Sequence, residues 1–246
     1  MIQEYLERGV AAGLIAGLAY GLYMVLVGNP LSEYAHDAGH DHGHDHGGHD
    51  HAGHAVSEAT TAVVSAGSGV LWGIFLGGVL ALALYLFEPA LPGSEAAKPY
   101  VVAAAGFLTV SAVPWLVLPP AAPGAEHLYA IEPRLAIYLG LALVGAVTVA
   151  AAIAAYKRGV RRGFGPGLVA GAVPILAVAV ILPLATPTIT THPELSADLV
   201  AAYQGLAVLS QAALWLLTAG AFDGLRRRSP IRENRPTPTE GETLAD

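Results

Sequence analysis

Six long apolar runs, separated by polar stretches, dominate the pattern of this chain. They cover residues 9–28, 67–87, 100–118, 135–156, 167–184 and 201–222. Each run is long enough to cross a hydrocarbon core of about 30 Å as a helix that rises about 1.5 Å per residue. Lipid offers the backbone no hydrogen-bond partners, and no alternating pattern of about ten residues suggests a barrel. The pattern therefore predicts six membrane-spanning helices.

Composition supports the same fold class. Of the 246 residues, 54% are hydrophobic and 13% are charged, whereas an average soluble domain has about 25% charged residues. A soluble helical bundle would also need charged stripes at helical spacing, which the six runs lack. We expect an all-α, polytopic membrane bundle over residues 1–228, followed by a disordered cytoplasmic tail over 229–246. The first run is followed by no A-x-A-like cleavage site and is taken as a retained span.

The distribution of Lys and Arg predicts the orientation. With six spans, eleven of the twelve basic residues fall on one side, and only Arg134 falls on the other. Basic residues are retained in cytoplasmic connections. We therefore expect both termini in the cytoplasm and the first, third and fifth connections outside the cell membrane.

Small residues recur at every fourth position in the first two runs. The first run has Gly9, Gly13, Gly17 and Gly21, and the second has Ser65, Gly69, Gly73 and Gly77. Such stripes allow helix backbones to approach closely. They predict that the first two helices pack through these faces.

The first connection, a predicted external loop over residues 31–65, carries the strongest chemical signal. Eight of the ten histidines lie within 19 residues, interleaved with aspartates and glycines. The tract consists of His36, His40, His42, His44, His46, His49, His51 and His54 with Asp37, Asp41, Asp45 and Asp50. Neutral imidazole is the commonest ligand of borderline divalent metals, and carboxylates add charge attraction. We expect a flexible metal-capturing loop, whose affinity falls as the pH drops through about 6.5. A solvated linker and a pH-responsive loop are the alternatives.

Other candidate residues lie in the outer connections or at the mouths of spans. His127 and His192 are single histidines on the predicted outer side, where each is either a metal ligand or a solvated side chain. The candidates for an ion pathway are Glu33, Glu132, Arg134 and Tyr138. Arg134 either pairs with a nearby glutamate or snorkels to the lipid headgroups. Within the spans, ionisable groups are nearly absent, so a path for ions would depend on carbonyls, water and a few residues: Thr109, Ser111, Thr148, Gln204, Ser210 and Gln211.

Several function classes are disfavoured. The net charge is −7, and no basic stripe with interleaved aromatics is present, so nucleic acid is not an expected partner. The chain has no cysteine, which excludes disulfides and thiolate metal sites. It has no phosphate-binding loop and no H-E-x-x-H motif. We expect a protein that is not an enzyme, has no catalytic residues and holds no tightly bound cofactor.

Short motifs in a fixed order resemble the CbtA family, the predicted membrane subunit of a cobalt transporter. They are GLIAG at 13–17, NPLSEY at 29–34, VPWLVLPP at 113–120, EPRLAIY at 132–138, HPE at 192–194 and QAALW at 211–215. The resemblance implies cobalt uptake linked to cobalamin synthesis, with a small His-containing membrane partner, CbtB. It carries over to Glu33, Pro114, Pro119, Arg134, Tyr138 and His192. The stretch PPAAP at 119–123 lacks an asparagine expected in the family.

The cobalt assignment depends on the resemblance alone. Imidazole and carboxylate ligands do not separate Co²⁺ from Ni²⁺ or Zn²⁺ by softness, and the Irving–Williams order favours nickel and zinc. The leading hypothesis is an uptake subunit in which the tract hands the ion to His127, His192, Glu132 and Arg134. A nickel or zinc permease, a metal efflux protein and a membrane metal sensor or buffer that transports nothing remain open. A homo-oligomer is compatible with the sequence.

Overall fold

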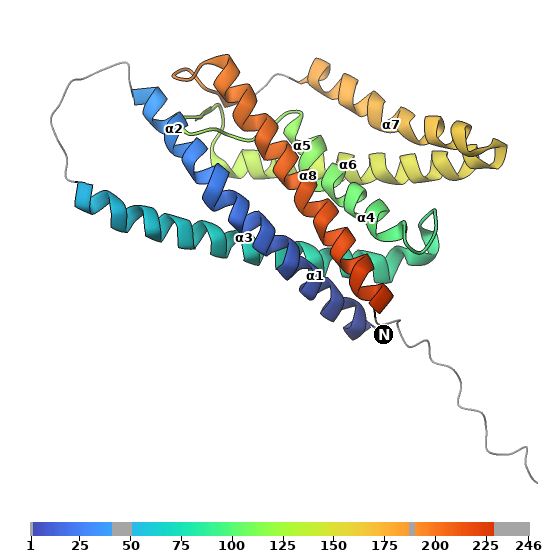
Figure 1. The fold of residues 1–246 in the computed structure, drawn as a ribbon. Helices are drawn as coiled ribbons and strands as arrows, with labels where there is room; N and C mark the ends of the chain where they lie inside the picture. Colours follow the sequence, from blue (N-terminus) through green and yellow to red (C-terminus); the bar gives the residue numbers. More distant parts are fainter. Residues whose placement is uncertain (1, 41–50, 187–189, 229–246) are drawn as a thin grey trace, which may run out of the picture.

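The structure, a computed structural model, describes residues 2–40, 51–186 and 190–228 and is almost entirely helical (Figure 1). The first half contains α1 (Ile2–Tyr23), π-helical η1 (Met24–Gly28), α2 (Asn29–His40), α3 (His51–Phe87), η2 (Glu88–Ala90), α4 (Lys98–Phe107), π-helical η3 (Leu108–Ala112) and α5 (Val113–Trp115). The second half contains β1 (Glu126–His127), α6 (Ile131–Gly159), η4 (Val160–Arg162), α7 (Phe164–Ala185), β2 (Thr190–Thr191) and α8 (Ala197–Arg228).

Within the described residues, five helices are long and apolar enough to cross a membrane. They are Ile2–Ala38, Ala59–Ala90, Ile131–Arg162, Phe164–Ala185 and Ala197–Arg228. The predicted third span, 100–118, is not among these five. It is helical from Lys98 to Trp115, but a π-helical turn divides it and the helix ends before Pro119. The structure thus has five helices long enough to span a membrane and one shorter, composite helix, where the sequence predicted six spanning runs.

The first connection is also narrower than the predicted loop. α1, η1 and α2 follow one another without a break to His40, and α3 already begins at His51. Pro30 cannot donate to the preceding turn, and the π-helical turn just before it absorbs this missing hydrogen bond. Helix therefore occupies residues 31–40 and 51–65. The predicted tail, 229–246, lies outside the described residues.

The glycine stripes of α1 and α3 face each other, as predicted. A Cβ on Gly17 would lie 2.8 Å from the carbonyl oxygen of Val70, and a Cβ on Gly69 would lie 2.9 Å from Cα of Gly21. A Cβ on Gly13 would overlap the carbonyl oxygen of Gly73. The two backbones are in direct contact, where dispersion holds them together.

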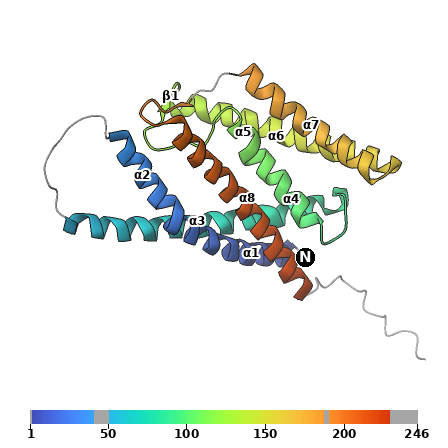
Figure 2. The same ribbon diagram turned by 45° about the horizontal axis from the view of Figure 1, so that its top comes forward.

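A buried apolar cluster joins α1, α3, α4 and α8. Its largest members are Leu76, Leu80, Leu84, Leu214, Trp215 and Phe222. The α6–α7 hairpin lies to one side of this cluster in both ribbon views (Figure 2). α7 contributes almost nothing to the interior, since only Gly167 of this helix is buried.

Charged and polar contacts divide between the two ends of the bundle. At one end, Glu88 accepts a hydrogen bond from the Tyr5 hydroxyl and lies 3.8 Å from the Lys98 ammonium and 3.7 Å from the Arg226 guanidinium. Lys157 donates to the carbonyl of Ala90, which brings the α6–α7 connection to the same end. The N-terminus of α1, the C-terminus of α8 and the second and fourth connections thus share this end, which we call the basic end.

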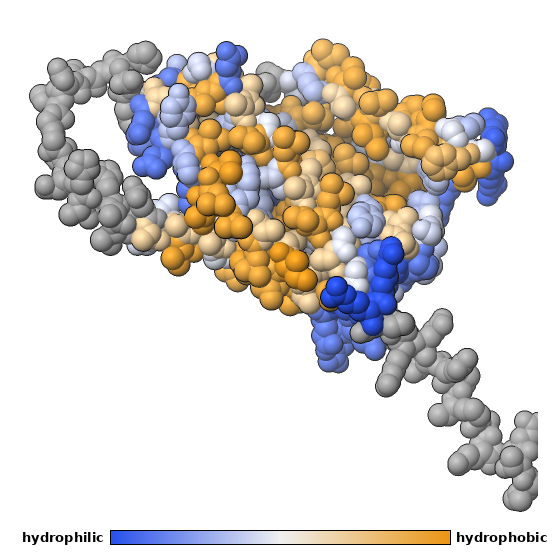
Figure 3. All heavy atoms as spheres, in the orientation of Figure 1, coloured by the Kyte–Doolittle hydropathy of each residue, from blue (hydrophilic) through white to orange (hydrophobic). Residues whose placement is uncertain are grey.

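The opposite end is formed by the other connections. Ser65 donates to the Asn29 side chain at 3.0 Å, and the hydroxyls of Ser32 and Tyr203 lie 3.4 Å apart, so that α2, α3 and the start of α8 meet there. Figure 3 shows hydrophobic residues over the middle of the helices and hydrophilic residues near the N-terminus and at the α6–α7 turn. We call this second end the tract end, because the histidine tract connects α2 to α3.

Candidate metal site at the tract end

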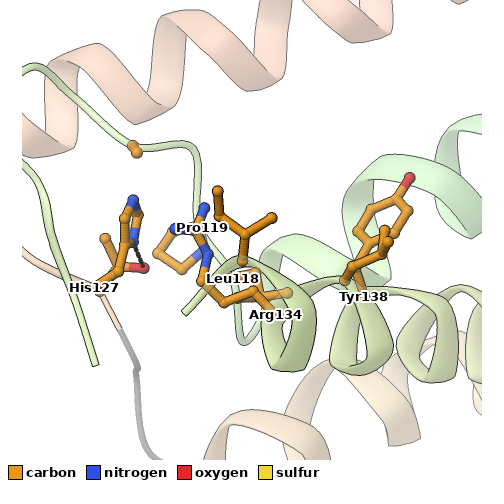
Figure 4. Close-up of a pocket in the computed structure, with 9 residues that line it drawn as sticks. Leu118, Pro119, His127, Arg134 and Tyr138 are labelled. Carbon is orange, nitrogen blue, oxygen red and sulfur yellow. Dashed lines mark hydrogen bonds between the residues drawn. The ribbon is translucent and has the colours of Figure 1, made fainter. Parts of the chain in front are cut away.

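A pocket of about 340 Å³ opens at the tract end, between the third connection and the start of α6. Its wall consists of Leu118, Pro119, Ala121, His127, Ile131, Arg134, Leu135, Tyr138 and Thr190 (Figure 4). Three residues that were singled out in the sequence, His127, Arg134 and Tyr138, therefore line one cavity although two different segments supply them.

The first turns of α6 place the side chains on one wall. Ile131, Arg134, Leu135 and Tyr138 are spaced by three, four and seven residues and so lie on one face of the helix. Pro133 is tolerated in this first turn because its missing N–H would have no partner inside the helix. Glu132 is exposed and is not among the residues that line the pocket.

A two-residue antiparallel pairing between the third and fifth connections forms the opposite wall. Residues Glu126 and His127 pair with Thr191 and Thr190 in an antiparallel register. The Thr190 hydroxyl, which is buried, lies 3.4 Å from Nδ1 of His127. This strand pairing holds the imidazole of His127 at the pocket. Each strand has only two residues, which is too short for an alternating sequence pattern to predict it.

His192 has a structural contact. Its Nε2 atom accepts a hydrogen bond from the backbone N–H of Ala122 at 3.0 Å. This hydrogen bond joins the fifth connection to the third. It also occupies the lone pair of Nε2 through which His192 would bind a metal ion. His192 therefore positions the loop that carries His127.

Tyr138 links the pocket to the composite helix. Its hydroxyl donates to the carbonyl oxygen of Val110 at 2.9 Å. Val110 lies in the π-helical turn η3, and such turns leave carbonyls without their usual helical partners. Pro114, four residues after Val110, also has no N–H to donate, so the Tyr138 hydroxyl supplies the hydrogen bond that the helix cannot give this carbonyl.

The charges around the pocket disfavour a tightly bound metal ion. Partial loss of solvent around the His127 imidazole and the positive charge of Arg134 lower the pKa of His127 below its usual value, which favours the neutral imidazole with a free lone pair. Arg134 forms no ion pair within residues 2–40, 51–186 and 190–228, and no carboxylate is part of the pocket wall. In the described part of the chain, no three His, Asp or Glu side chains are placed to hold a metal together.

The remaining predicted site residues do not converge on this pocket. Glu33, His36 and Asp37 lie exposed on α2 at the same end. His40, His51 and His54 lie in helices, but their side chains are outside the described set. The other tract residues, His42, His44, His46, His49, Asp41, Asp45 and Asp50, lie outside the described residues.

The long apolar helices define a polytopic helical membrane protein. The sequence profile of a family described as "Probable cobalt transporter subunit (CbtA)" matches residues 2–226, nearly the whole chain, and the chain belongs to this family. The resemblance noted in the sequence is therefore confirmed. No curated protein and no solved structure matches the chain.

Proposed function

We propose that this chain is the membrane-spanning subunit of a transporter that takes up Co²⁺, and that the His- and Asp-rich tract captures the ion outside the cell. Membership of a family of transporter subunits supports transport rather than enzyme activity. The main support for the proposal is that the helices flanking the tract and the pocket at His127 lie at the same end of the bundle. Both lie at the end of the bundle opposite the basic end.

The proposed topology has six crossings with both termini in the cytoplasm. The helical stretch from Lys98 to Trp115 serves as the third crossing, since it starts beside Glu88 at the basic end and leads to the tract end near Tyr138. Val102 and Ala103 of this stretch belong to the same buried cluster as Leu214 of α8. Its shortness and its π-helical turn fit a helix that is sheltered by protein on one side.

In the proposed uptake step, the tract collects the ion and His127 receives it. His127 supplies one neutral nitrogen, and tract residues or water supply the other ligands. Arg134 disfavours a stable resting place for a bare cation beside it. Such a site passes the ion on and does not store it.

The family description as a subunit implies partners, and a small CbtB-like membrane protein is the proposed one. α7 leaves Val173, Leu176, Val180 and Leu184 exposed. This apolar face is compatible with lipid and with a partner helix.

Sidedness can be tested directly because the chain has no native cysteine. Single-cysteine variants Gly48→Cys, in the tract, and Ser94→Cys, at the basic end, are treated in intact cells with a membrane-impermeant maleimide. We expect labelling of the first variant only. Labelling of the Ser94→Cys variant alone would contradict uptake through an external tract.

Uptake of radioactive Co²⁺ by cells completes the test. Deletion of residues 41–50 should reduce uptake at scarce metal and leave uptake at abundant metal nearly unchanged. Metal binding by the purified chain without any uptake by cells would favour the sensor or buffer reading instead. A change only in release from preloaded cells would favour efflux.

A further inference from the structure

The connection between α6 and α7 carries another pocket, of about 340 Å³, at the basic end of the bundle. Its lining consists of Ala155, Arg158, Gly159, Arg162 and Ala170. The first four of these residues are spaced by three, four and seven positions, so they lie on one face at the end of α6 and in η4. The pocket therefore combines two guanidinium groups with three small residues.

Close contact between α6 and α7 shapes the small-residue part of this pocket. A Cβ on Gly159 would lie 2.9 Å from Cα of Gly167 and 3.0 Å from Cβ of Ala170. The two helices thus meet almost backbone to backbone at this point. Because no long side chain comes from Ala155, Gly159 or Ala170, the space beside the two arginines stays open.

The two arginines of the pocket have no internal counter-charge. In the part of the chain that the structure describes, neither guanidinium group forms an ion pair or a hydrogen bond. The ion pairs at the basic end join Glu88, Glu95 and Asp223 to cations of α4 and α8 instead.

Repulsion within the connection favours an external anion. Arg158 and Arg162 are both exposed and stand four residues apart, a spacing at which like charges repel each other. Over α6, η4 and α7 the sequence has one acidic residue, Glu132, which lies at the opposite end of α6. An anion between the two guanidinium groups removes this repulsion.

The pocket lies at the level where the hairpin leaves the apolar part of the membrane. The apolar run of α6 ends at Tyr156, and the basic residues follow directly. On α7, the side chains of Val169 and Val173 are more than half exposed. Figure 3 shows the hydrophilic surface of the α6–α7 turn next to hydrophobic surface of the same hairpin. A ligand with an anionic head and an apolar tail fits both surfaces.

We propose that this pocket binds the phosphate headgroup of an anionic phospholipid, with Arg158 and Arg162 as its ligands and the acyl chains along α7. Guanidinium groups match phosphate oxygens with two parallel hydrogen bonds and keep their charge at physiological pH. Basic pockets between membrane helices on the cytoplasmic side bind anionic headgroups. In the proposed topology the lipid belongs to the cytoplasmic leaflet. The inference goes beyond cobalt uptake and does not depend on it.

The bound lipid stabilises the position of the hairpin. α7 buries only Gly167, and Lys157 joins the connection to the rest of the basic end by its hydrogen bond to the carbonyl of Ala90. A phosphate between the arginines fixes this end of the hairpin at headgroup level. Since a ligand of the folded state raises its stability, an anionic lipid should also raise the melting temperature.

Native mass spectrometry of the purified full-length chain tests the site. The chain is stripped of lipid in detergent and receives phosphatidylglycerol, which is anionic, or phosphatidylcholine with the same acyl chains, which has no net charge. We expect one phosphatidylglycerol to bind at least about tenfold more tightly, the effect of one charge-assisted hydrogen bond. Equal binding of the two lipids overturns the proposal. Displacement of phosphatidylglycerol by an equal concentration of inorganic phosphate also overturns it, since the site is then one for a free anion.

Substitutions of exposed arginines separate a defined site from general attraction to positive charge. Arg158→Gln and Arg162→Gln should each weaken phosphatidylglycerol binding about tenfold. Arg161→Gln removes the same charge from an exposed residue outside the pocket lining and is the matched control. Its effect should stay below about twofold, because solvent and salt screen its charge. An equal loss in all three variants would show that no defined site exists.

Arg162→Lys separates charge from geometry at the same position. Lysine keeps the positive charge but not the two parallel hydrogen bonds, so part of the affinity for phosphatidylglycerol should be lost. Because the substituted side chains are exposed, the melting temperatures without lipid should match that of the native chain, which shows that the variants are folded. Full affinity of the Arg162→Lys variant would contradict recognition by the guanidinium group.

Discussion

Trp215 of α8 lies directly against the backbone of Gly106 of α4, and its indole ring fills the space that any larger residue would need for a Cβ. Trp215 is almost fully buried. Its Nε1 has no hydrogen-bond partner among the described residues. The contact is therefore one of shape alone, and it joins the composite helix to α8.

Gly106→Ala should destabilise the protein by about 1–3 kcal/mol, the range for overpacked interiors. Trp215→Phe removes the ring atoms that would overlap the new methyl group and sacrifices no hydrogen bond. The double variant should therefore be more stable than the sum of the two single changes predicts. Thermal unfolding of the four proteins in detergent forms the cycle that measures this coupling. Strict additivity would show that the two residues are not in contact.

The α1–α3 contact predicts a similar sensitivity at a glycine stripe. Gly13→Ala places a methyl group on the carbonyl of Gly73 and should lower the melting temperature clearly. Gly78→Ala, on α3 but with open space around its Cβ, is the control and should be neutral or slightly stabilising. Equal melting temperatures for the two variants would be evidence against close backbone packing.

Tyr138→Phe removes the hydrogen bond to the carbonyl of Val110. The expected cost is about 0.5–1.5 kcal/mol, because the π-turn acceptor loses its partner. Tyr129→Phe, at an exposed tyrosine of the neighbouring loop, should change nothing. Chemical unfolding of both variants measures their free energies of unfolding. Equal values would show that the hydrogen bond of Tyr138 to Val110 does not stabilise the contact between α6 and the composite helix.

The protonation of His127 should respond to Arg134. Partial desolvation and the positive charge of Arg134 lower the pKa of His127, so in the folded protein it titrates below about 6.5, the usual value. The unfolded state then binds more protons near this pH, and the contribution of His127 to stability, present above about 6.5, is lost as the pH falls. Arg134→Gln should move the pKa upward. NMR titration of a variant with the tract histidines replaced measures it, and an unchanged or lower value would contradict the assigned cause.

The sequence alone determined the fold class, because the length and polarity of the apolar runs leave lipid-embedded helices as the only way to satisfy the backbone. It also predicted the α1–α3 packing, because four-residue glycine spacing places all members of a stripe on one face. The family could be inferred from the order of short motifs, of which EPRLAIY places Arg134 and Tyr138 on one side of a helix.

Only the tertiary structure decided which of these residues meet. Three hydrogen-bond contacts join segments far apart in the chain: His192 with Ala122, His127 with Thr190, and Tyr138 with Val110. Such long-range contacts leave no periodic signal in the sequence. The π-helical turns depend on packing as well, since η1 and η3 read as ordinary helix in the sequence. Each turn ends two residues before a proline, Pro30 or Pro114, whose missing N–H breaks the ordinary helical register. The prolines mark where the register changes, but packing against neighbouring helices decides whether the helix bends, ends or continues there as a π-turn.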